Sequence, residues 1–196
     1  DERMCDILER LNTFTNSKQL PCKLLLRIGA YPITSGNTSI NTAIDRANYA
    51  KEQCTIDHKT TYAYYNDAMR HRRQREQRLE QEMSDALVNG EFHIYYQPKI
   101  NCRTNTIVGA EALIRWHHVA DGIIPPGEFI PLFEKNGFVT QTDLFAFEKV
   151  CQLQAERQEK GQVLFPISCN FSRLHLSRTD FVDNLVEIVD RYGVSH

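Results

Sequence analysis

Three absences narrow the class of protein. No apolar run approaches the roughly 20 residues of a membrane span, and the N-terminus, DERMCDILER, does not have the shape of a signal peptide. The formal net charge is only −2, so no basic field favours duplex nucleic acid as a partner. With 41% hydrophobic and 24% charged residues among 196, the composition is that of an ordinary globular protein.

The cysteines also lack a pattern. No CxxC pair occurs, although the chain has six cysteines: Cys5, Cys22, Cys54, Cys102, Cys151 and Cys169. A disulfide framework or a zinc knuckle needs regularly spaced cysteines, so we expect reduced thiols in a cytoplasmic protein. The chain opens inside a helical pattern and stops just after another, which leads us to expect a fragment.

In the first third of the chain, segments with the apolar spacing of a helix alternate with segments typical of strands. Apolar residues recur at helical spacing over 2–16 and over 40–53, whereas 23–33 and 60–66 have the composition of strands. The order helix–strand–helix–strand predicts part of an α/β or α+β layer.

Residues 67–88 form a different kind of segment. They contain no Gly or Pro, and strong helix formers dominate, so we expect one long helix that ends at Asn89-Gly90. Arginines crowd its first half: Arg70, Arg72, Arg73, Arg75 and Arg78. They could form a nucleic-acid patch. A solvated connector helix with Arg–Glu pairs three or four residues apart is the favoured alternative, since no aromatic or Gly-rich segment accompanies them.

The last part of the chain predicts a different order. Strands over 92–100 and 107–116, joined by a turn over 101–106, predict an antiparallel hairpin. After it we expect a loop over 121–127, helices over 127–136 and 143–160, a strand over 163–172 and a helix over 179–192. The alternation of strand and helix is typical of a parallel α/β arrangement.

One carboxylate, Glu111, lies in an otherwise apolar run, IVGAEALIRW (107–116). A buried carboxylate needs a cation or a set of donors to compensate it. Glu111, Leu113 and Arg115 are two residues apart and therefore share one face of the expected strand. This face can hold a cation and a phosphate side by side, but a structural Glu–Arg pair fits the same spacing.

Two amides are further candidates. Asn170, which shares a strand face with Ser172, is either a hydrogen-bonded structural residue or a neutral oxygen ligand for a hard cation. Gln97, directly before Pro98, ends the Tyr-rich strand with an amide that can contact a base edge or a sugar.

The neighbouring histidines His117 and His118 resemble a metal-binding pair at first sight. Adjacent side chains on a strand point to opposite faces. We therefore expect both histidines in a surface loop, not as ligands.

Taken together, these motifs resemble the first half of EAL domains, the cyclic-di-GMP phosphodiesterases. The resemblance covers roughly residues 86–196 and rests on four stretches: FHIYYQPKI, IVGAEALIRW, IIPPGEFIPLFEKNGFV and ISCNFS. The EAL fold is an α/β fold, a modified (β/α)8 TIM barrel whose first strand runs antiparallel. The resemblance implies this fold, and the expected hairpin agrees with it.

The resemblance also implies roles for individual residues. Glu111 and Asn170 would be catalytic metal ligands, and Gln97, Leu113 and Arg115 would hold the dinucleotide. The implied reaction is hydrolysis of one phosphodiester bond of cyclic-di-GMP to linear pGpG, with Mg²⁺ or Mn²⁺ as the cofactor. The guanidinium of Arg115 would contact a phosphate.

The family's remaining acids and its lysine would follow residue 196. About 110 residues do not close a barrel that normally takes about 250, so we expect that the 196 residues alone do not hydrolyse the dinucleotide. The alternative is a catalytically inactive EAL-like module that binds cyclic-di-GMP or a protein partner. Because such barrels often pair, a homodimer through the EAL domain is a further expectation.

Residues 1–66 resemble the C-terminal part of a GGDEF domain, the diguanylate cyclase family. The resemblance rests on LLLRIGAYPI and on AIDRANYAKEQ, where Asn48 replaces the family's tyrosine. We therefore expect a degenerate GGDEF part over 1–66, a connector helix over 67–90 and half an EAL domain over 91–196. This tandem order belongs to bacterial signalling proteins, some of them tethered to a membrane.

Overall fold

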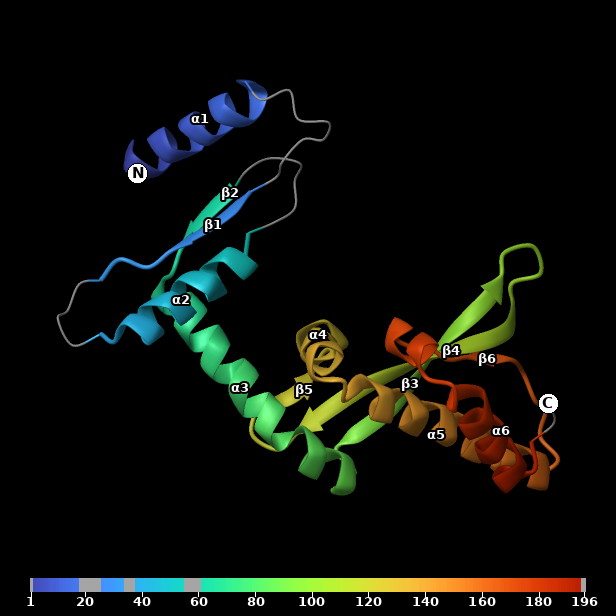
Figure 1. Cartoon of the computed structure of the whole chain (residues 1–196). Helices are drawn as coiled ribbons and strands as arrows, with labels where there is room; N and C mark the ends of the chain where they lie inside the picture. The colour runs from blue at the N-terminus through green and yellow to red at the C-terminus, as the bar shows by residue number, and fades with distance from the viewer. Residues whose placement is uncertain (1, 18–25, 34–37, 55–60, 195–196) are drawn as a thin grey trace. The chain divides into compact units, whose positions relative to one another are not determined.

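The computed structural model describes residues 2–17, 26–33, 38–54 and 61–194 of the chain (Figure 1). The chain divides into two compact units, Asp1–Arg75 and Glu76–His196. Among the described residues, no helix combines the length and apolar character that crossing a membrane requires.

The first unit contains a parallel strand pair. Its elements are α1 (Glu2–Ser17), β1 (Arg27–Ala30), α2 (Ile40–Glu52) and β2 (Thr61–Tyr64), and β1 pairs with β2 in parallel. The predicted order of helices and strands is confirmed. The strand predicted over 23–33 is shorter, because only Arg27–Ala30 pairs, and residues 23–25 lie outside the described residues.

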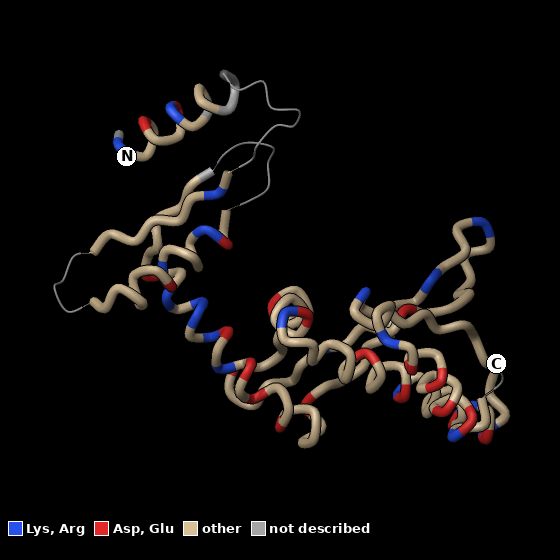
Figure 2. Tube along the Cα trace, viewed as in Figure 1, with Lys and Arg blue, Asp and Glu red and all other residues tan. Residues whose placement is uncertain are grey.

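Helix α3 (Asp67–Val88) passes from the first unit into the second. Its predicted extent is confirmed, and Figure 2 shows its basic residues followed by acidic ones. Arg70 pairs with Asp67 over 3.4 Å, as expected for residues three apart. Within the second unit, however, Leu79 and Ala86 are buried in the hydrophobic core. The C-terminal half of α3 is therefore part of a packed layer, not only a solvated connector.

The second unit is built on a four-stranded sheet: β3 (Phe92–Asn101), β4 (Thr106–His118), β5 (Gly122–Ile124) and β6 (Ile167–Ser168). The predicted antiparallel hairpin is confirmed as β3–β4. The loop predicted over 121–127 is partly wrong, because β5 pairs with the end of β4. Of the strand predicted over 163–172, only β6 pairs, in parallel with β4; Pro166, directly before it, has no N–H to donate.

Helices cover one face of this sheet. They are α4 (Pro126–Asn136), α5 (Val139–Glu159), the 3₁₀ helix η1 (Arg173–Ser177) and α6 (Phe181–Tyr192). α5 contacts β4, and α6 packs along α5 (Figure 1). α5 begins four residues before its predicted start at residue 143.

An aromatic cluster forms the core between the sheet and the helices. Trp116 of β4 and Phe129 and Phe133 of α4 are fully buried, and the rings of Trp116 and Phe92 lie 5.1 Å apart. Burial of such rings is the main source of stability for this unit, at about 1.5–3 kcal/mol per large apolar side chain. The core fixes which face of β4 is turned away from the helices.

Candidate functional site

The predicted site residues of β3 and β4 lie on the face opposite the aromatic core. In the register of the hairpin, Gln97 is opposite Glu111, Tyr95 is opposite Leu113, and His93 is opposite Arg115. Residues directly opposite in an antiparallel pair share a face. Ala112 and Trp116, which alternate with them, are buried on the helix-covered side. The apolar neighbours of Glu111 in the sequence therefore do not surround its carboxylate.

Strand β6 brings Asn170 to the same place. Ser168, the last residue of β6, pairs with Glu111, and Asn170 follows two residues later in the chain. The side-chain nitrogen Nδ2 of Asn170 lies 2.7 Å from Oε1 of Glu111. The structure thus joins the two predicted metal ligands across 59 positions of the sequence.

Two basic side chains lie on this face. The Nζ of Lys99 donates to Oγ of Ser168 over 2.6 Å. The guanidinium of Arg115 donates to the carbonyl of Ile114 over 2.9 Å and lies 5.7 Å from the ring centre of Tyr95. Within the described part of the chain, Arg115 and Glu111 do not form an ion pair. The alternative of a structural Glu–Arg pair is therefore not realised.

Sequence reasoning missed a polar network directly behind Asn170. The carboxylate of Asp143 in α5 accepts from the backbone N–H of Ser172 over 2.8 Å and contacts Nε2 of His175 over 3.1 Å. The carboxylate of Glu134 in α4 accepts from the hydroxyl of Ser172 over 2.9 Å. Burial raises the pKa of Asp143, and the N–H of Ser172 opposes this effect. In the sequence, Asp143 stands out only as an acidic residue among the apolar residues of α5.

A cavity of about 310 Å³ adjoins this network, between the sheet and helices α4 and α5. Its lining includes Glu134, Asp143, Cys169 and Asn170. Burial raises the pKa of the Cys169 thiol to about 11. Near neutral pH the free thiol is therefore protonated.

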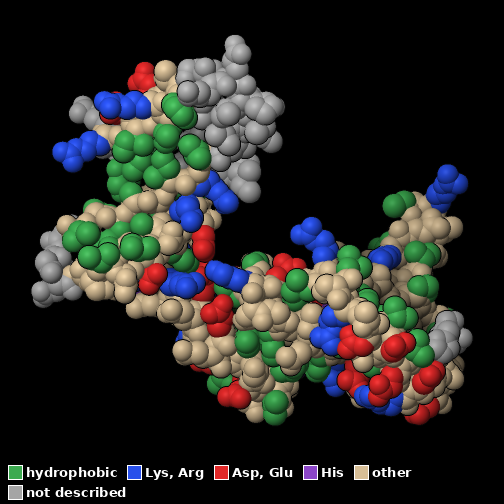
Figure 3. Space-filling view, viewed as in Figure 1, with side chains coloured by type: hydrophobic (Ala, Val, Ile, Leu, Met, Phe, Trp, Pro, Cys, Tyr) green, Lys and Arg blue, Asp and Glu red, His purple; other side chains and the backbone are tan. Residues whose placement is uncertain are grey.

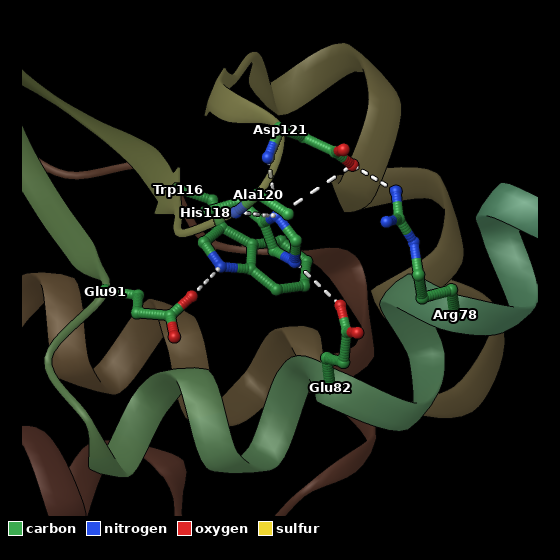
Figure 4. A network of polar contacts seen from close by, with 7 residues as sticks. All are labelled: Arg78, Glu82, Glu91, Trp116, His118, Ala120 and Asp121. Carbon is green, nitrogen blue, oxygen red and sulfur yellow. Dashed lines mark hydrogen bonds and ion pairs between the residues drawn. The ribbon is translucent and has the colours of Figure 1, made fainter.

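The predicted location of His117 and His118 in a surface loop is wrong, because both belong to β4. His118 is only 8% exposed, and its Nε2 lies 2.7 Å from the carboxylate of Glu82 in α3 (Figure 4). Its Nδ1 accepts from the backbone N–H groups of Ala120 and Asp121. No local sequence pattern predicts this contact, since Glu82 lies 36 residues away in the chain.

Arg78 and Trp116 extend this network. Arg78 of α3 pairs with the carboxylate of Asp121, and the indole N–H of Trp116 donates to Glu91 over 2.9 Å. Figure 4 shows that the first contact joins α3 to the turn after β4, and that the second joins β4 to the residue directly before β3. The strand that carries Glu111 is thus held from behind by polar contacts as well as by the aromatic core.

The donor set at Glu111 and Asn170 fits a hard divalent cation. Mg²⁺ takes oxygen ligands and is commonly held by one or two carboxylates, waters and substrate phosphates. Glu111 offers a carboxylate, and a rotation of the Asn170 amide would exchange its nitrogen for its oxygen. No cluster of three or more His, Cys, Asp or Glu residues suited to a metal occurs among the described residues.

The fold and this site define a class of protein: an α/β domain with oxygen donors at the exposed face of a sheet. The family described as EAL domain matches residues 80–196. The chain belongs to the EAL domain family.

Similar proteins agree with this assignment. The bifunctional diguanylate cyclase/cyclic di-GMP phosphodiesterase MucR of Pseudomonas aeruginosa is 28% identical over 133 residues, 68% of this chain and 19% of MucR. The biofilm architecture maintenance protein MbaA of Vibrio cholerae is 30% identical over 172 residues, 86% of this chain and 21% of MbaA. The chain therefore spans about a fifth of the length of these curated relatives.

A solved structure is similar as well. The structure described as the PaMucR phosphodiesterase in complex with c-di-GMP superposes with a TM-score of 0.56 at 29% identity. The similarity covers 60% of this chain and 47% of the other. It supports an EAL-type α/β fold for the second unit.

Proposed function

We propose that this chain is part of a cyclic-di-GMP phosphodiesterase that hydrolyses the cyclic dinucleotide to linear pGpG. The observation that carries the proposal is the contact between Glu111 and Asn170, which places a carboxylate and an amide together on the open face of β4. Membership of the EAL family and the likeness to a MucR phosphodiesterase structure support the substrate class.

In this proposal each residue on the open face has a distinct task. Glu111 and Asn170 would hold Mg²⁺ or Mn²⁺, which supplies charge to activate water and to neutralise a phosphate. Arg115 would bind a phosphate through its two-pronged guanidinium. Gln97, opposite Glu111 in the register, and Leu113 would contact the dinucleotide beside the scissile bond.

The test separates binding from turnover. The purified chain is titrated with Mn²⁺ by electron paramagnetic resonance and with cyclic-di-GMP by calorimetry, beside a Glu111→Gln variant. Release of pGpG is measured on the longer protein that we expect to contain the chain. Mn²⁺ uptake that Glu111→Gln abolishes, together with turnover, supports the proposal. Uptake of neither ligand contradicts it, and dinucleotide binding without turnover favours the non-hydrolysing module.

We also propose that residues 1–66 derive from a GGDEF domain. The parallel pairing of β1 with β2, with α2 between them in sequence, supports a βαβ unit of an α/β or α+β domain. The match to MbaA is longer than the EAL match, so it extends to residues before residue 80. The boundaries at residues 66 and 90, the homodimer and the cytoplasmic location stay predictions.

A further inference from the structure

Asn170 is not held in place by the sheet itself. Strand β6 ends at Ser168, and the Asn170 side chain is exposed. A ligand side chain on an irregular segment needs support from residues around it if its geometry is to be kept. The support must come from contacts made after the strand ends.

Those contacts converge on Ser172, two residues beyond Asn170. Its N–H donates to Oδ2 of Asp143 over 2.8 Å, and its hydroxyl donates to Oε1 of Glu134 over 2.9 Å. Two carboxylates from two different helices thus accept hydrogen bonds from one residue, one from its backbone and one from its side chain. Hydrogen bonds to a charged acceptor are the stronger kind.

The carboxylate of Asp143 also contacts His175. Its Nε2 lies 3.1 Å from Oδ2 of Asp143, and its side chain is only 2% exposed. The imidazole lies 4.3 Å from the ring centre of Phe181 and 5.6 Å from that of Phe171. Asp143 therefore approaches Ser172 from a rigid, packed side.

We propose that Glu134, Asp143 and His175 are positioning residues that hold the amide of Asn170 against Glu111 by gripping Ser172. We call Ser172, Glu134, Asp143 and His175 together the Ser172 clamp. The inference rests on the proposed function for the meaning of the Glu111–Asn170 pair. The geometry of the clamp can nevertheless be tested without metal or nucleotide.

The reach of the clamp follows from chain geometry. Only Phe171 separates Ser172 from Asn170, so the position of Ser172 restricts Asn170 to within about 7 Å of it. A displacement of even 1 Å breaks a hydrogen bond of 2.7 Å. Loss of one grip on Ser172 should therefore release the Asn170 amide from Glu111.

The experiment follows the side-chain amide of Asn170 by ¹H–¹⁵N NMR in the purified chain. Its signal pair is assigned by its loss in Asn170→Asp. In Ser172→Ala and Asp143→Asn, we expect the pair to move toward the shifts of a free amide and to exchange with water roughly fivefold faster. Glu111→Gln should give a similar change, because it weakens the same hydrogen bond.

Two controls make the outcome decisive. Ser172→Thr keeps both donors and should retain the wild-type signal, and Asp183→Asn removes an exposed acid of α6 without an effect. An unchanged Asn170 signal in folded Ser172→Ala would overturn the clamp; this variant decides if Asp143→Asn fails to fold. Failure of the proposed function is seen separately, as absent Mn²⁺ uptake by a wild-type chain whose Asn170 signal responds to the clamp variants.

Discussion

The imidazole of His118 lies 2.7 Å from the carboxylate of Glu82, joining β4 to α3 on the face opposite Glu111. Nδ1 of His118 accepts two backbone N–H groups, so the ring proton belongs on Nε2, where it is donated to Glu82. Contacts at both ring nitrogens therefore fix the orientation of the imidazole. One strand thus presents site residues on one side and an anchor to the helix on the other.

Replacing His118 with Ala should destabilise the second unit. The change removes three hydrogen bonds and leaves a cavity, and we expect a loss of about 2–3 kcal/mol in the free energy of unfolding. Urea unfolding followed by the fluorescence of Trp116, the chain's single tryptophan, measures it. His71→Ala, at an exposed position of α3, is the matched control and should change stability by less than about 0.5 kcal/mol.

Asn170→Asp should make the chain's stability depend on divalent cations. A carboxylate in place of the amide would stand beside Glu111, and two such groups repel each other unless a cation lies between them. We expect a lower melting temperature in EDTA and a larger rise with Mn²⁺ than in the wild type. Thermal unfolding with and without Mn²⁺ measures both effects.

Asn170→Ala is the reference for this test, because it removes the amide without adding charge. Equal Mn²⁺ responses in the Asp and Ala variants would show that the two side chains do not share a cation. A response in the Asp variant alone agrees with the proposed ligand pair.

Much of the site could be predicted from local pattern. The alternation of residues in β4 put Glu111, Leu113 and Arg115 on one face, and the register places Gln97 there too. A period of two residues is a property of any strand, so it needs no tertiary information. The short turn between the two strands likewise made the hairpin a local prediction.

The features that were not predicted share one cause: each depends on contacts between residues far apart in the sequence. The local pattern does not indicate the buried position of His118, because its partner Glu82 lies on another element. Asp143 and His175 meet Ser172 only when α5 packs on the sheet. Strand β5 has only three residues, Gly122–Ile124, and is defined by pairing with β4 and not by its composition.

Asp180 should titrate with a pKa of about 2, because Arg178 donates hydrogen bonds to its carboxylate. A lowered pKa in the folded state means that this pair stabilises the fold above the ordinary pKa near 3.8. The contribution is lost as the pH falls through about 2. Because both side chains are exposed, salt should weaken the effect. Figure 3, which has the same view as Figure 1, shows that charged side chains gather over α6.

An NMR pH titration of the Asp180 carboxyl carbon checks this value. In Arg178→Gln the pKa should rise toward 3.8, the ordinary value. A wild-type carboxyl that already titrates near that value contradicts the predicted pairing.

Gly109→Ala should separate β6 from β4 and disturb the site at a distance. A Cβ at this position would lie 2.7 Å from the carbonyl oxygen of Pro166, the atom that accepts from the N–H of Ala110. The backbone must shift to relieve this overlap, so we expect a loss of about 1–3 kcal/mol in the free energy of unfolding. The same shift should weaken the contact of Asn170 with Glu111, which urea unfolding and the Asn170 amide signal report together.

Gly127→Ala is the matched control, because a Cβ there meets no atom within 4 Å beyond its chain neighbours and the nearby backbone of its own helix. Position 127 lies in the first turn of α4, where Ala is a better helix former than Gly by about 1 kcal/mol. We therefore expect an equal or higher stability for this variant and an unchanged Asn170 signal. If Gly109→Ala behaved like Gly127→Ala in both measurements, the close approach of β4 to residue 166 could not be what holds the two ligand-bearing segments together.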